Sequence, residues 1–534
     1  MRTTEIAVVG AGPAGMCAAI AAAEAGAQVT LLDENERPGG QLFKQIHKFF
    51  GSREHYAGVR GIDIGRELLA RTEKAGVNVQ LGSVVWGIFP DLVLGVMCNG
   101  QVDRLQTKRL IIATGATENS LPFPGWTLPG VMGAGAAQTL ANLHRVLPGQ
   151  RVLMVGSGNV GLIVSHQLIQ AGAEVVALVE ALPKVAGYFV HAAKIARAGV
   201  PIYVSHTVIE ARGDGQVESA TIAQVDQGWK PIKGTEKTVS VDTICLAVGL
   251  TPLIELAALA GCQTVYVGKL GGQVPVHDDS MQTSVPGIYV AGDVAGIEEA
   301  TTAMETGRLA GLAAAESLGY SPPWADDLRT KARRSLEALR GGQFRKHEPS
   351  VDAGEEKAEA IRGDGAPQEA PMTLGSYAVN AVATDSDLAT SPGVPSAQAV
   401  AQGPVAVIEC FQEIPCNPCE LACKRGAISV GTPITNLPIL AADKCTGCGR
   451  CIAACPGQAI FVIDGKAGRV SFPHEYLPLP VKGQTVQCTG RNGQPLVEGT
   501  VVHVANPKGN DRTPVVTVQV GSEWVMRVRG MRRL

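Results

Sequence analysis

The cysteines of this chain are concentrated in one stretch, and their spacing is typical of a metal-binding segment. Eight of the 13 cysteines lie within residues 410–455. The second half of this stretch reads Cys445-x2-Cys448-x2-Cys451-x3-Cys455-Pro456. Thiolates are ligands for soft metal centres, and this spacing lets one loop supply three corners of an iron–sulfur cube. A pair of zinc sites is the alternative that spacing alone leaves open.

The first half of the stretch repeats the second half with a shift of 32 residues. The shift aligns Cys448, Cys451 and Cys455 with Cys416, Cys419 and Cys423. It fails at Cys445, which aligns with Glu413, although Cys410 stands three residues earlier. In such paired runs the fourth cysteine binds the other cluster of the pair. The predicted ligand sets are therefore Cys410, Cys416, Cys419 and Cys455 for the first cluster, and Cys445, Cys448, Cys451 and Cys423 for the second.

Residues 405–465 resemble a bacterial two-cluster ferredoxin domain, with Lys424 in the place of the usual proline after the first run. The resemblance implies two [4Fe–4S] clusters.

A glycine-rich turn near the start of the chain has the spacing of a dinucleotide-binding turn. Gly10, Gly12, Pro13 and Gly15 follow an apolar strand and open an alanine-rich helix. Gly12 lets the backbone approach a pyrophosphate, and the helix N-terminus attracts its negative charge. Asp33 closes the next strand, where a carboxylate can accept hydrogen bonds from ribose hydroxyls.

Three further stretches indicate which dinucleotide binds: Gly39-Gly40-Gln41, Thr114-Gly115 and Gly292-Asp293. With the first turn, they resemble the flavoproteins with two dinucleotide-binding domains, the thioredoxin reductase and pyridine nucleotide–disulfide oxidoreductase superfamily, over roughly residues 1–320. The resemblance implies that the turn, Asp33 and Gly40-Gln41 hold FAD, and that Thr114-Gly115 supports the pyrophosphate region. Asp293 would face the ribityl chain of the flavin from a helix N-terminus.

A second glycine-rich turn contains Gly156, Gly158 and Gly161, and Glu180 closes the strand that follows. In the superfamily this inserted domain binds NAD(P)H. The carboxylate of Glu180 would repel a 2′-phosphate, which favours NAD over NADP. The alternative is a domain kept as a scaffold without nucleotide.

The chain departs from the disulfide reductases of the superfamily, because it has no CxxC before Cys416. We therefore expect that the flavin does not reduce a disulfide. In this departure, the chain resembles the α subunits of heteromeric amine and imino-acid dehydrogenases. It also resembles them in the stretches Gly39-Gly40-Gln41 and Phe49-Phe50-Gly51-Ser52. This group includes the proline dehydrogenase, sarcosine oxidase, opine oxidase and hydrogen cyanide synthase complexes.

That resemblance implies an electron-transfer subunit in a hetero-oligomer. Its partners would be a flavoprotein dehydrogenase subunit and an electron acceptor, with FMN held between subunits in some complexes. Two alternatives remain open. One is a self-sufficient NADH-dependent reductase that serves ferredoxin-like acceptors, and the other is a non-catalytic scaffold for assembly.

Composition limits the other function classes. The 534 residues carry a net charge of −3, without the basic excess of a nucleic-acid-binding protein. The uncharged run Ile6–Ala23 contains glycines and a proline, so it predicts a strand, a turn and a helix rather than a transmembrane segment. No secretory signal is recognisable, and we expect a cytoplasmic protein.

Alternating strands and helices predict an α/β fold with two interleaved Rossmann-like domains, followed by an α+β ferredoxin-like domain and a small β-rich cap. The predicted boundaries are 1–125 and 251–345 for the two parts of the FAD-binding domain, 126–250 for the NAD(P)-binding-like domain, 346–404 for a linker, 405–470 for the ferredoxin-like domain and 471–534 for the cap. A basic stretch with Lys48 and His55 is expected to be a solvated loop, with a cation near the flavin as the alternative.

Overall fold

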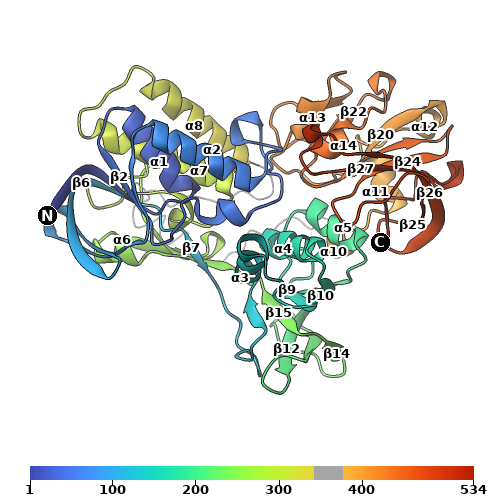
Figure 1. Ribbon diagram of the computed structural model, residues 1–534, viewed down its shortest axis with the longest axis horizontal. Helices are drawn as coiled ribbons and strands as arrows, with labels where there is room; N and C mark the ends of the chain where they lie inside the picture. Colours follow the sequence, from blue (N-terminus) through green and yellow to red (C-terminus); the bar gives the residue numbers. More distant parts are fainter. Residues whose placement is uncertain (342–376) are drawn as a thin grey trace. The chain divides into compact units, whose positions relative to one another are not determined.

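The computed structural model describes residues 1–341 and 377–534, which fall into two compact units (Figure 1). Unit 1 comprises Met1–Ile46, Val59–Glu118 and the described part of Gly249–Gln368, and unit 2 comprises His47–Gly58, Asn119–Val248 and the described part of Glu369–Leu534. The first part of the predicted linker 346–404 lies outside the described residues, and its last part carries three short helices: α10 (Tyr377–Asn380), α11 (Asp385–Thr390) and α12 (Ala397–Gln402).

Unit 1 is built on a seven-stranded sheet of order β3-β2-β1-β6-β5-β4, with β19 also paired to β6. Its parallel strands are β1 (Arg2–Val9), β2 (Val29–Leu32), β3 (Asn78–Gln80), β6 (Gln101–Ile112) and β19 (Ile288–Val290). The antiparallel strands β4 (Ser83–Phe89) and β5 (Val93–Cys98) extend it. The sheet confirms the predicted Rossmann-like fold.

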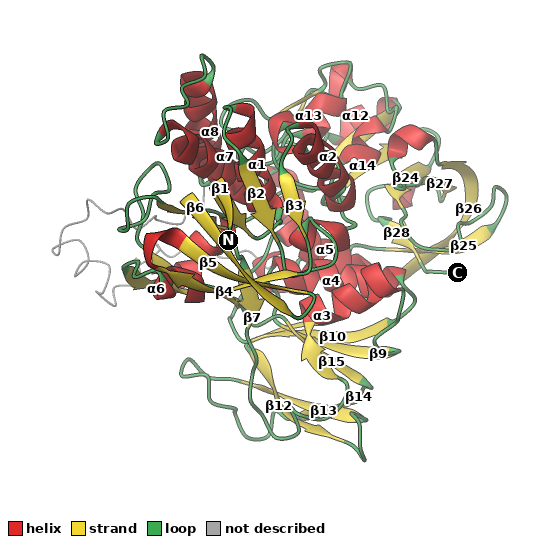
Figure 2. Cartoon of the chain, turned by 60° about the vertical axis from the view of Figure 1, so that its left-hand side comes forward, coloured by secondary structure: helices red, strands yellow, loops and turns green. Residues whose placement is uncertain are grey.

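The helices α1 (Pro13–Glu24), α2 (Gly61–Lys74) and α7 (Ala300–Glu316) pack side by side on this sheet (Figure 2). Two glycines allow α7 to approach α1 closely. An added Cβ would lie 2.2 Å from the Ala14 carbonyl oxygen at Gly307, and 2.1 Å from the Ala18 carbonyl oxygen at Gly311. Any larger side chain at these positions would push the two helices apart.

Smaller elements complete unit 1. They are β7 (Ala116–Glu118), which pairs with β16 (Leu250–Pro252), the hairpin β17 (Thr264–Val267) and β18 (Gly272–Pro275), and the helices α6 (Glu255–Leu259) and α8 (Ala325–Leu339). In the described part of the chain, no helix has the length and apolar character needed to cross a membrane.

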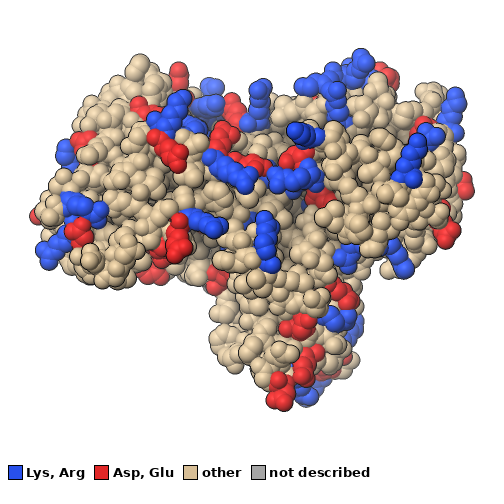
Figure 3. All heavy atoms as spheres, in the orientation of Figure 1, with Lys and Arg blue, Asp and Glu red and all other residues tan. Residues whose placement is uncertain are grey.

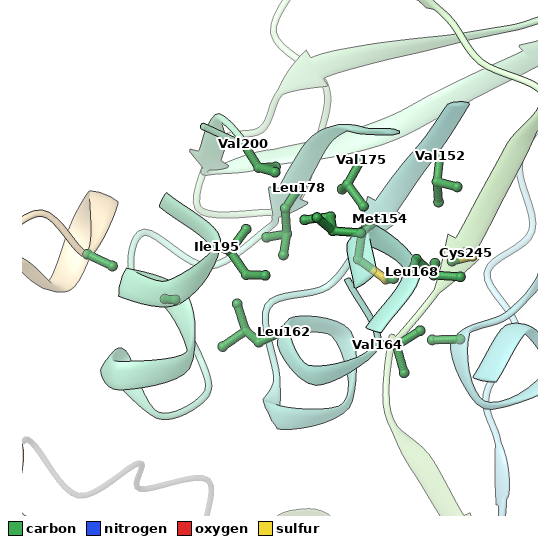
Figure 4. Close-up of a cluster of buried hydrophobic side chains, with 14 of the residues drawn as sticks. Val152, Met154, Leu162, Val164, Leu168, Val175, Leu178, Ile195, Val200 and Cys245 are labelled. Carbon is green, nitrogen blue, oxygen red and sulfur yellow. The ribbon is translucent and has the colours of Figure 1, made fainter. Parts of the chain in front are cut away.

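Unit 2 contains a second parallel sheet of order β11-β10-β9-β15-β8. Its strands are β8 (Val131–Gly133), β9 (Arg151–Val155), β10 (Glu174–Glu180), β11 (Ile202–Val204) and β15 (Thr243–Leu246), with helices α3 (Ala134–Thr139), α4 (Asn159–Gln170) and α5 (Phe189–Arg197). Figure 4 shows Leu162 and Ile195 of the helices facing Met154 of β9 in the buried core. An antiparallel sheet of β12 (His206–Arg212), β13 (Ser219–Gln224) and β14 (Lys237–Ser240) lies beside it.

The C-terminal part of unit 2 is organised by one seven-stranded sheet of order β20-β23-β24-β27-β26-β25-β28. The strands are β20 (Pro404–Ile408), β23 (Ile460–Asp464), β24 (Arg469–Pro473), β25 (Thr485–Thr489), β26 (Pro495–Ala505), β27 (Val515–Gln519) and β28 (Gly530–Met531). The cysteine segment contributes α13 (Pro418–Ala422), β21 (Ile428–Ser429), β22 (Ile439–Leu440) and α14 (Arg450–Ala454). The strands of the cysteine module and those of the β-rich cap therefore share one sheet.

Candidate cofactor-binding sites

The first glycine-rich turn joins β1 to α1, and its three glycines have different surroundings. Gly10 has a φ of +105°, and an added Cβ would lie 2.2 Å from the Ala113 carbonyl oxygen. An added Cβ at Gly15 would lie 1.8 Å from the Gly10 carbonyl oxygen. At Gly12, by contrast, it would meet no atom of the described chain within 4 Å, and Pro13 begins α1 beside it. The turn thus leaves open space at the helix N-terminus, as a pyrophosphate requires.

Asp33 lies buried just after β2, and its carboxylate contacts the turn. One oxygen accepts a hydrogen bond from the Ala11 N–H at 2.6 Å, and the other accepts from the backbone and side-chain N–H groups of Asn35, both at 2.8 Å. A carboxylate has about four acceptor positions, so Asp33 retains acceptor capacity for ribose hydroxyls.

The Gly39-Gly40-Gln41 stretch crosses the same turn. The Gly39 N–H donates to the Ala11 carbonyl at 2.7 Å. An added Cβ at Gly40 would lie 2.9 Å from the Cα of Gly12, so only glycine permits this approach. Gln41 is exposed at the start of the following 3-10 helix.

The two later stretches also lie in unit 1. Thr114 donates its hydroxyl to the Leu253 carbonyl at 2.7 Å, and an added Cβ at Gly115 would have no neighbour among described atoms within 4 Å. Asp293 lies in a short 3-10 helix, Gly292–Ala295, whereas α7 begins only at Ala300. Gly292 and Asp293 line a small cavity.

The second turn repeats the geometry of the first. Gly156 has a φ of +102°, and an added Cβ there would lie 2.2 Å from the Ala247 carbonyl oxygen. At Gly161 it would lie 2.1 Å from the Gly156 carbonyl oxygen. Gly158 corresponds to Gly12, because an added Cβ would meet no described atom within 4 Å.

Glu180 occupies the place of Asp33 in this second domain. It is buried, and one carboxylate oxygen accepts from the backbone N–H and the hydroxyl of Ser157 at 2.8 and 2.6 Å. The other oxygen accepts from the Leu182 N–H at 2.9 Å. The contact between the acidic residue and the second position of the turn is therefore the same in both domains.

A residue that the sequence analysis did not identify completes the correspondence. The Gly187 N–H donates to the Ser157 carbonyl at 2.9 Å, as Gly39 does to Ala11. An added Cβ at Gly187 would lie 2.8 Å from the backbone nitrogen of Asn159, the first residue of α4. A single glycine in a loop gives no sequence signal for this role.

Four of the clustered cysteines line one cavity in unit 2, namely Cys410, Cys416, Cys419 and Cys455. The apolar wall includes Phe50, Val190, Ile408, Ile414 and Ile460. Glu413, which aligns with Cys445 in the repeat, is exposed and is not part of the wall. The first run of the sequence repeat lacks a fourth thiol, and the loop that begins at Cys410 places one in the wall of this cavity.

The thiols of this cavity lie among apolar side chains. Burial raises the pKa of Cys419 to about 12, and burial also raises the pKa of Cys416. Such thiols bind as thiolates only where metal supplies the opposing positive charge.

The other four cysteines, called the second set, are those predicted to hold the second cluster: Cys423, Cys445, Cys448 and Cys451. Ala427 donates its N–H to the Cys423 sulfur at 3.2 Å, and Ala459 donates to the Cys455 sulfur at 3.4 Å, which reproduces the 32-residue repeat. The Cys445 sulfur accepts from the Ala406 N–H at 3.4 Å. Cys451 is buried and Cys448 is exposed.

The segment His47–Gly58 packs within unit 2 against the cysteine module. Lys48 is only 6% exposed, and its Nζ donates to the carbonyls of Ala453 at 2.6 Å and Asn510 at 3.0 Å. His55 is also buried. The expectation of a solvated loop is therefore wrong for these two residues, because the segment forms part of a protein core.

Helix α5 adds a buried cation, Lys194, and a half-buried one, Arg197, that the sequence analysis did not identify. The Lys194 Nζ donates to the Pro456 carbonyl at 3.3 Å, and Arg197 donates to the Gln458 carbonyl at 2.8 Å. Helix α5 is distant in sequence from the cysteines. Only the tertiary contacts therefore show that Lys194 and Arg197 lie near Cys455.

Comparison with known families agrees with both parts of the chain. Residues 4–307 match the family model described as pyridine nucleotide-disulphide oxidoreductase. Residues 438–461, which include the second cysteine run, match the 4Fe-4S binding domain.

Similar proteins include subunits of two named enzymes. One opine oxidase subunit, from Agrobacterium tumefaciens (strain Ach5), is 32% identical over 64% of this chain and 71% of its own length. The hydrogen cyanide synthase subunit HcnB of Pseudomonas aeruginosa is 30% identical over 62% of this chain and 75% of its own length. The crystal structure of T. acidophilum thioredoxin reductase shares the fold, with 23% identity, a TM-score of 0.50, and coverage of 60% of this chain and 99% of that one.

The family match spans more than half of the chain and covers both glycine-rich turns. The chain is a flavoprotein oxidoreductase with an iron–sulfur domain, and it belongs to the pyridine nucleotide-disulphide oxidoreductase family.

Proposed function

We propose that this chain is the electron-transfer subunit of a multi-subunit dehydrogenase that acts on an amine, an imino acid or a related small substrate. The similar proteins named as subunits of opine oxidase and hydrogen cyanide synthase support this proposal. Its partners are a flavoprotein dehydrogenase subunit, with FMN held at the subunit interface, and an electron acceptor. Because cysteines without disulfide bonds and iron–sulfur ligands persist in reducing surroundings, we assign it to the cytoplasm.

One observation carries the proposal. The cavity with Cys410, Cys416, Cys419 and Cys455 includes Phe50 in its wall, and Phe50 follows Gln41 of the proposed flavin site by nine residues. Asn417 of the cysteine segment also donates its N–H to the Gly51 carbonyl at 3.1 Å. One short stretch of chain therefore links the proposed flavin-binding residues in sequence to the cysteine cavity, which supports a function that uses both cofactors.

The residue roles follow from the two cofactor types. When bound, FAD supplies two-electron chemistry and [4Fe–4S] clusters supply one-electron chemistry. The residues proposed to hold FAD are Gly10, Gly12, Pro13, Gly15, Asp33, Gly40, Gln41, Thr114, Gly115, Gly292 and Asp293. Two clusters are proposed, the first held by Cys410, Cys416, Cys419 and Cys455, and the second by Cys423, Cys445, Cys448 and Cys451.

The second candidate function is that of an NADH-dependent reductase. Open space at Gly158 and the buried carboxylate of Glu180 support NAD(H) binding at the turn Gly156–Gly161. In this function the same chain accepts hydride from NADH without a partner subunit. A turn kept only as scaffold would have no need for open space at Gly158.

Purification from the native host tests the proposal. We expect a partner subunit to co-purify, with one FAD and about eight irons in each copy of this chain. Anaerobic substrate should bleach the flavin only when the partner is present. A chain that purifies alone and is bleached by NADH would replace the proposal with the reductase, and a chain without iron would overturn both.

A further inference from the structure

The surface around the second cysteine set carries an unusual concentration of positive charge. The cations Lys424, Arg425, Lys444 and Arg450 are all exposed. Three of them stand directly beside a cysteine of this set, since Lys424 follows Cys423, Lys444 precedes Cys445 and Arg450 precedes Cys451. Figure 3 shows Lys and Arg side chains gathered over the α13 and β22 region.

The backbone brings the two charged turns together. Strand β21 pairs with β22, with Ile428 opposite Leu440. The Ala441 N–H donates to the Ala427 carbonyl at 2.8 Å. Lys424 and Arg425 lie in the turn before β21, and Lys444 lies in the turn after β22. The two charged turns are therefore adjacent. We call these four cations the basic rim.

The charge of the basic rim is not balanced locally. None of its four members forms a salt bridge with a carboxylate in the described ranges 1–341 and 377–534. Asp443 is exposed beside Lys444, and the Glu420 carboxylate instead accepts N–H groups of Val430 and Gly431. The surplus contrasts with the net charge of −3 of the whole chain.

The basic rim adjoins cysteines of the second set in the sequence, and one cysteine of this set is at the surface. Cys448 is exposed, whereas the first set lines an inner cavity with apolar walls. Two apolar side chains are exposed beside the rim, with Leu421 of α13 at 43% and Ile439 of β22 at 55%. A small apolar area with a charged rim is typical of transient electron-transfer interfaces, in which charge raises the rate of encounter.

We propose that the basic rim is the docking surface for an acidic one-electron carrier protein, which exchanges electrons with the chain at the Cys448 side of the second cluster. This inference rests on the proposed function, because it requires the second cluster. In each encounter one electron leaves the reduced chain, which is oxidised, and the carrier is reduced by one electron without proton transfer or bond change. Acidic side chains on the carrier would face the four cations.

The test uses the full chain with its flavin and clusters, pre-reduced with dithionite and freed of excess reductant. The probes are plastocyanin, an acidic copper protein, and cytochrome c, a basic haem protein of similar size. Stopped-flow absorbance gives the second-order rate constant of oxidation by each probe. Flavin and iron are counted in every sample beforehand, so a failure of cluster binding is distinguished from a failure of docking.

The test variant is Lys424→Glu/Arg425→Glu, and the matched control is Lys466→Glu/Lys482→Glu, two exposed lysines of the same unit outside the cysteine segment. We expect plastocyanin to oxidise the test variant at least ~10-fold more slowly than the unmodified chain, and cytochrome c to oxidise it faster. The control should change neither rate. Added salt should slow the reaction of the unmodified chain with plastocyanin, and this dependence should be lost in the test variant.

Equal rates for the test variant and the unmodified chain, with iron content intact, would overturn the proposal. If charge reversal lowers the iron content, the neutral variant Lys424→Gln/Arg425→Gln replaces it, and plastocyanin should oxidise this variant more slowly than the unmodified chain. A salt-independent rate with plastocyanin would then show that the basic rim does not dock an acidic carrier. Sedimentation with vesicles of anionic lipid that is abolished in the test variant, with unchanged plastocyanin rates, would also overturn it in favour of a membrane surface.

Discussion

Arg529 donates its Nε–H to the carboxylate of Glu409 at 2.6 Å, and both side chains are buried. Arg491 donates to the same carboxylate oxygen at 2.6 Å. Glu409 directly precedes Cys410, and Arg529 directly precedes β28. The segment with Arg529 therefore holds Glu409 in place, and Glu409 is the residue immediately before Cys410.

This ion pair predicts a large effect of a substitution far from the cysteines in sequence. Arg529→Met should lower the free energy of unfolding by about 3 kcal/mol, because it leaves a buried carboxylate with one of its two cationic partners. We also expect faster loss of iron, since the position of Cys410 depends on Glu409. Denaturant midpoints and the release of iron to a chelator measure the two effects.

Arg527→Met is the matched control, two residues away on the same segment. Arg527 is exposed and contacts the Trp524 ring at 5.4 Å from its centroid. Its loss should change the free energy of unfolding by no more than about 0.5 kcal/mol. Similar midpoints for the two variants would show that the Glu409 pair does not stabilise the module.

The same pair makes stability depend on pH. Burial alone would raise the pKa of Glu409, but Arg529 and Arg491 outweigh it and hold this pKa at about 2, below the usual 4.5. Since the pKa is lowered on folding, the stabilisation is complete above about pH 4.5 and is lost as the pH falls toward 2. Denaturant midpoints at pH 6, 4.5 and 3.5 should decline for the unmodified chain. Glu409→Gln should flatten this decline, and an equally steep one would assign it to other carboxylates.

The equivalent glycines of the two turns give a matched pair of variants. Both Gly12 and Gly158 face open space, so valine at either position should leave the fold intact and fill the place of a pyrophosphate. Gly12→Val should purify without the yellow absorbance of flavin. Gly158→Val should keep its flavin but lose any bleaching by NADH. Full flavin content in Gly12→Val would contradict the assignment of this turn to FAD.

The cysteine cavity predicts which thiols hold the first cluster. Cys410→Ser should damage only that cluster, leaving about four irons or a three-iron remnant, because serine is a poor substitute for thiolate. Glu413→Gln should leave both clusters in place, since Glu413 is exposed and outside the cavity. Iron analysis and low-temperature paramagnetic resonance decide between them. An unaltered spectrum for Cys410→Ser would show that this thiol is not a ligand.

A matched cysteine control is available in the core of the C-terminal sheet. Cys488 is fully buried on β25, and burial raises its pKa to about 12. Cys488→Ser should lower stability slightly without changing the iron content or the paramagnetic spectrum. Loss of iron in this variant would indicate that general destabilisation, rather than ligand loss, explains the effect of Cys410→Ser.

The local sequence by itself determined the parts of this protein that depend on short-range geometry. The strand, turn and helix predicted within Ile6–Ala23 are the end of β1, the turn with Gly10 and most of α1. The turns with Gly10 and Gly156 were predictable because positive φ and close approach to a neighbouring carbonyl both require glycine. The family and the iron–sulfur domain were predictable for the same reason, since the matched motifs are set by residue spacing.

Only the tertiary structure decided the features that join residues far apart in the chain. In the sequence repeat, Cys445 aligns with Glu413, so the first run lacks its fourth thiol. In the folded chain, Cys410 and Cys416 line the same cavity. Burial of Lys48 against the Ala453 carbonyl depends on a contact across 405 residues. The sheet that joins the cysteine module to the β-rich cap also depends on long-range contacts, because β23 pairs with β20 and β24 pairs with β27. Such contacts arise from the packing of whole elements, which no short window of sequence contains.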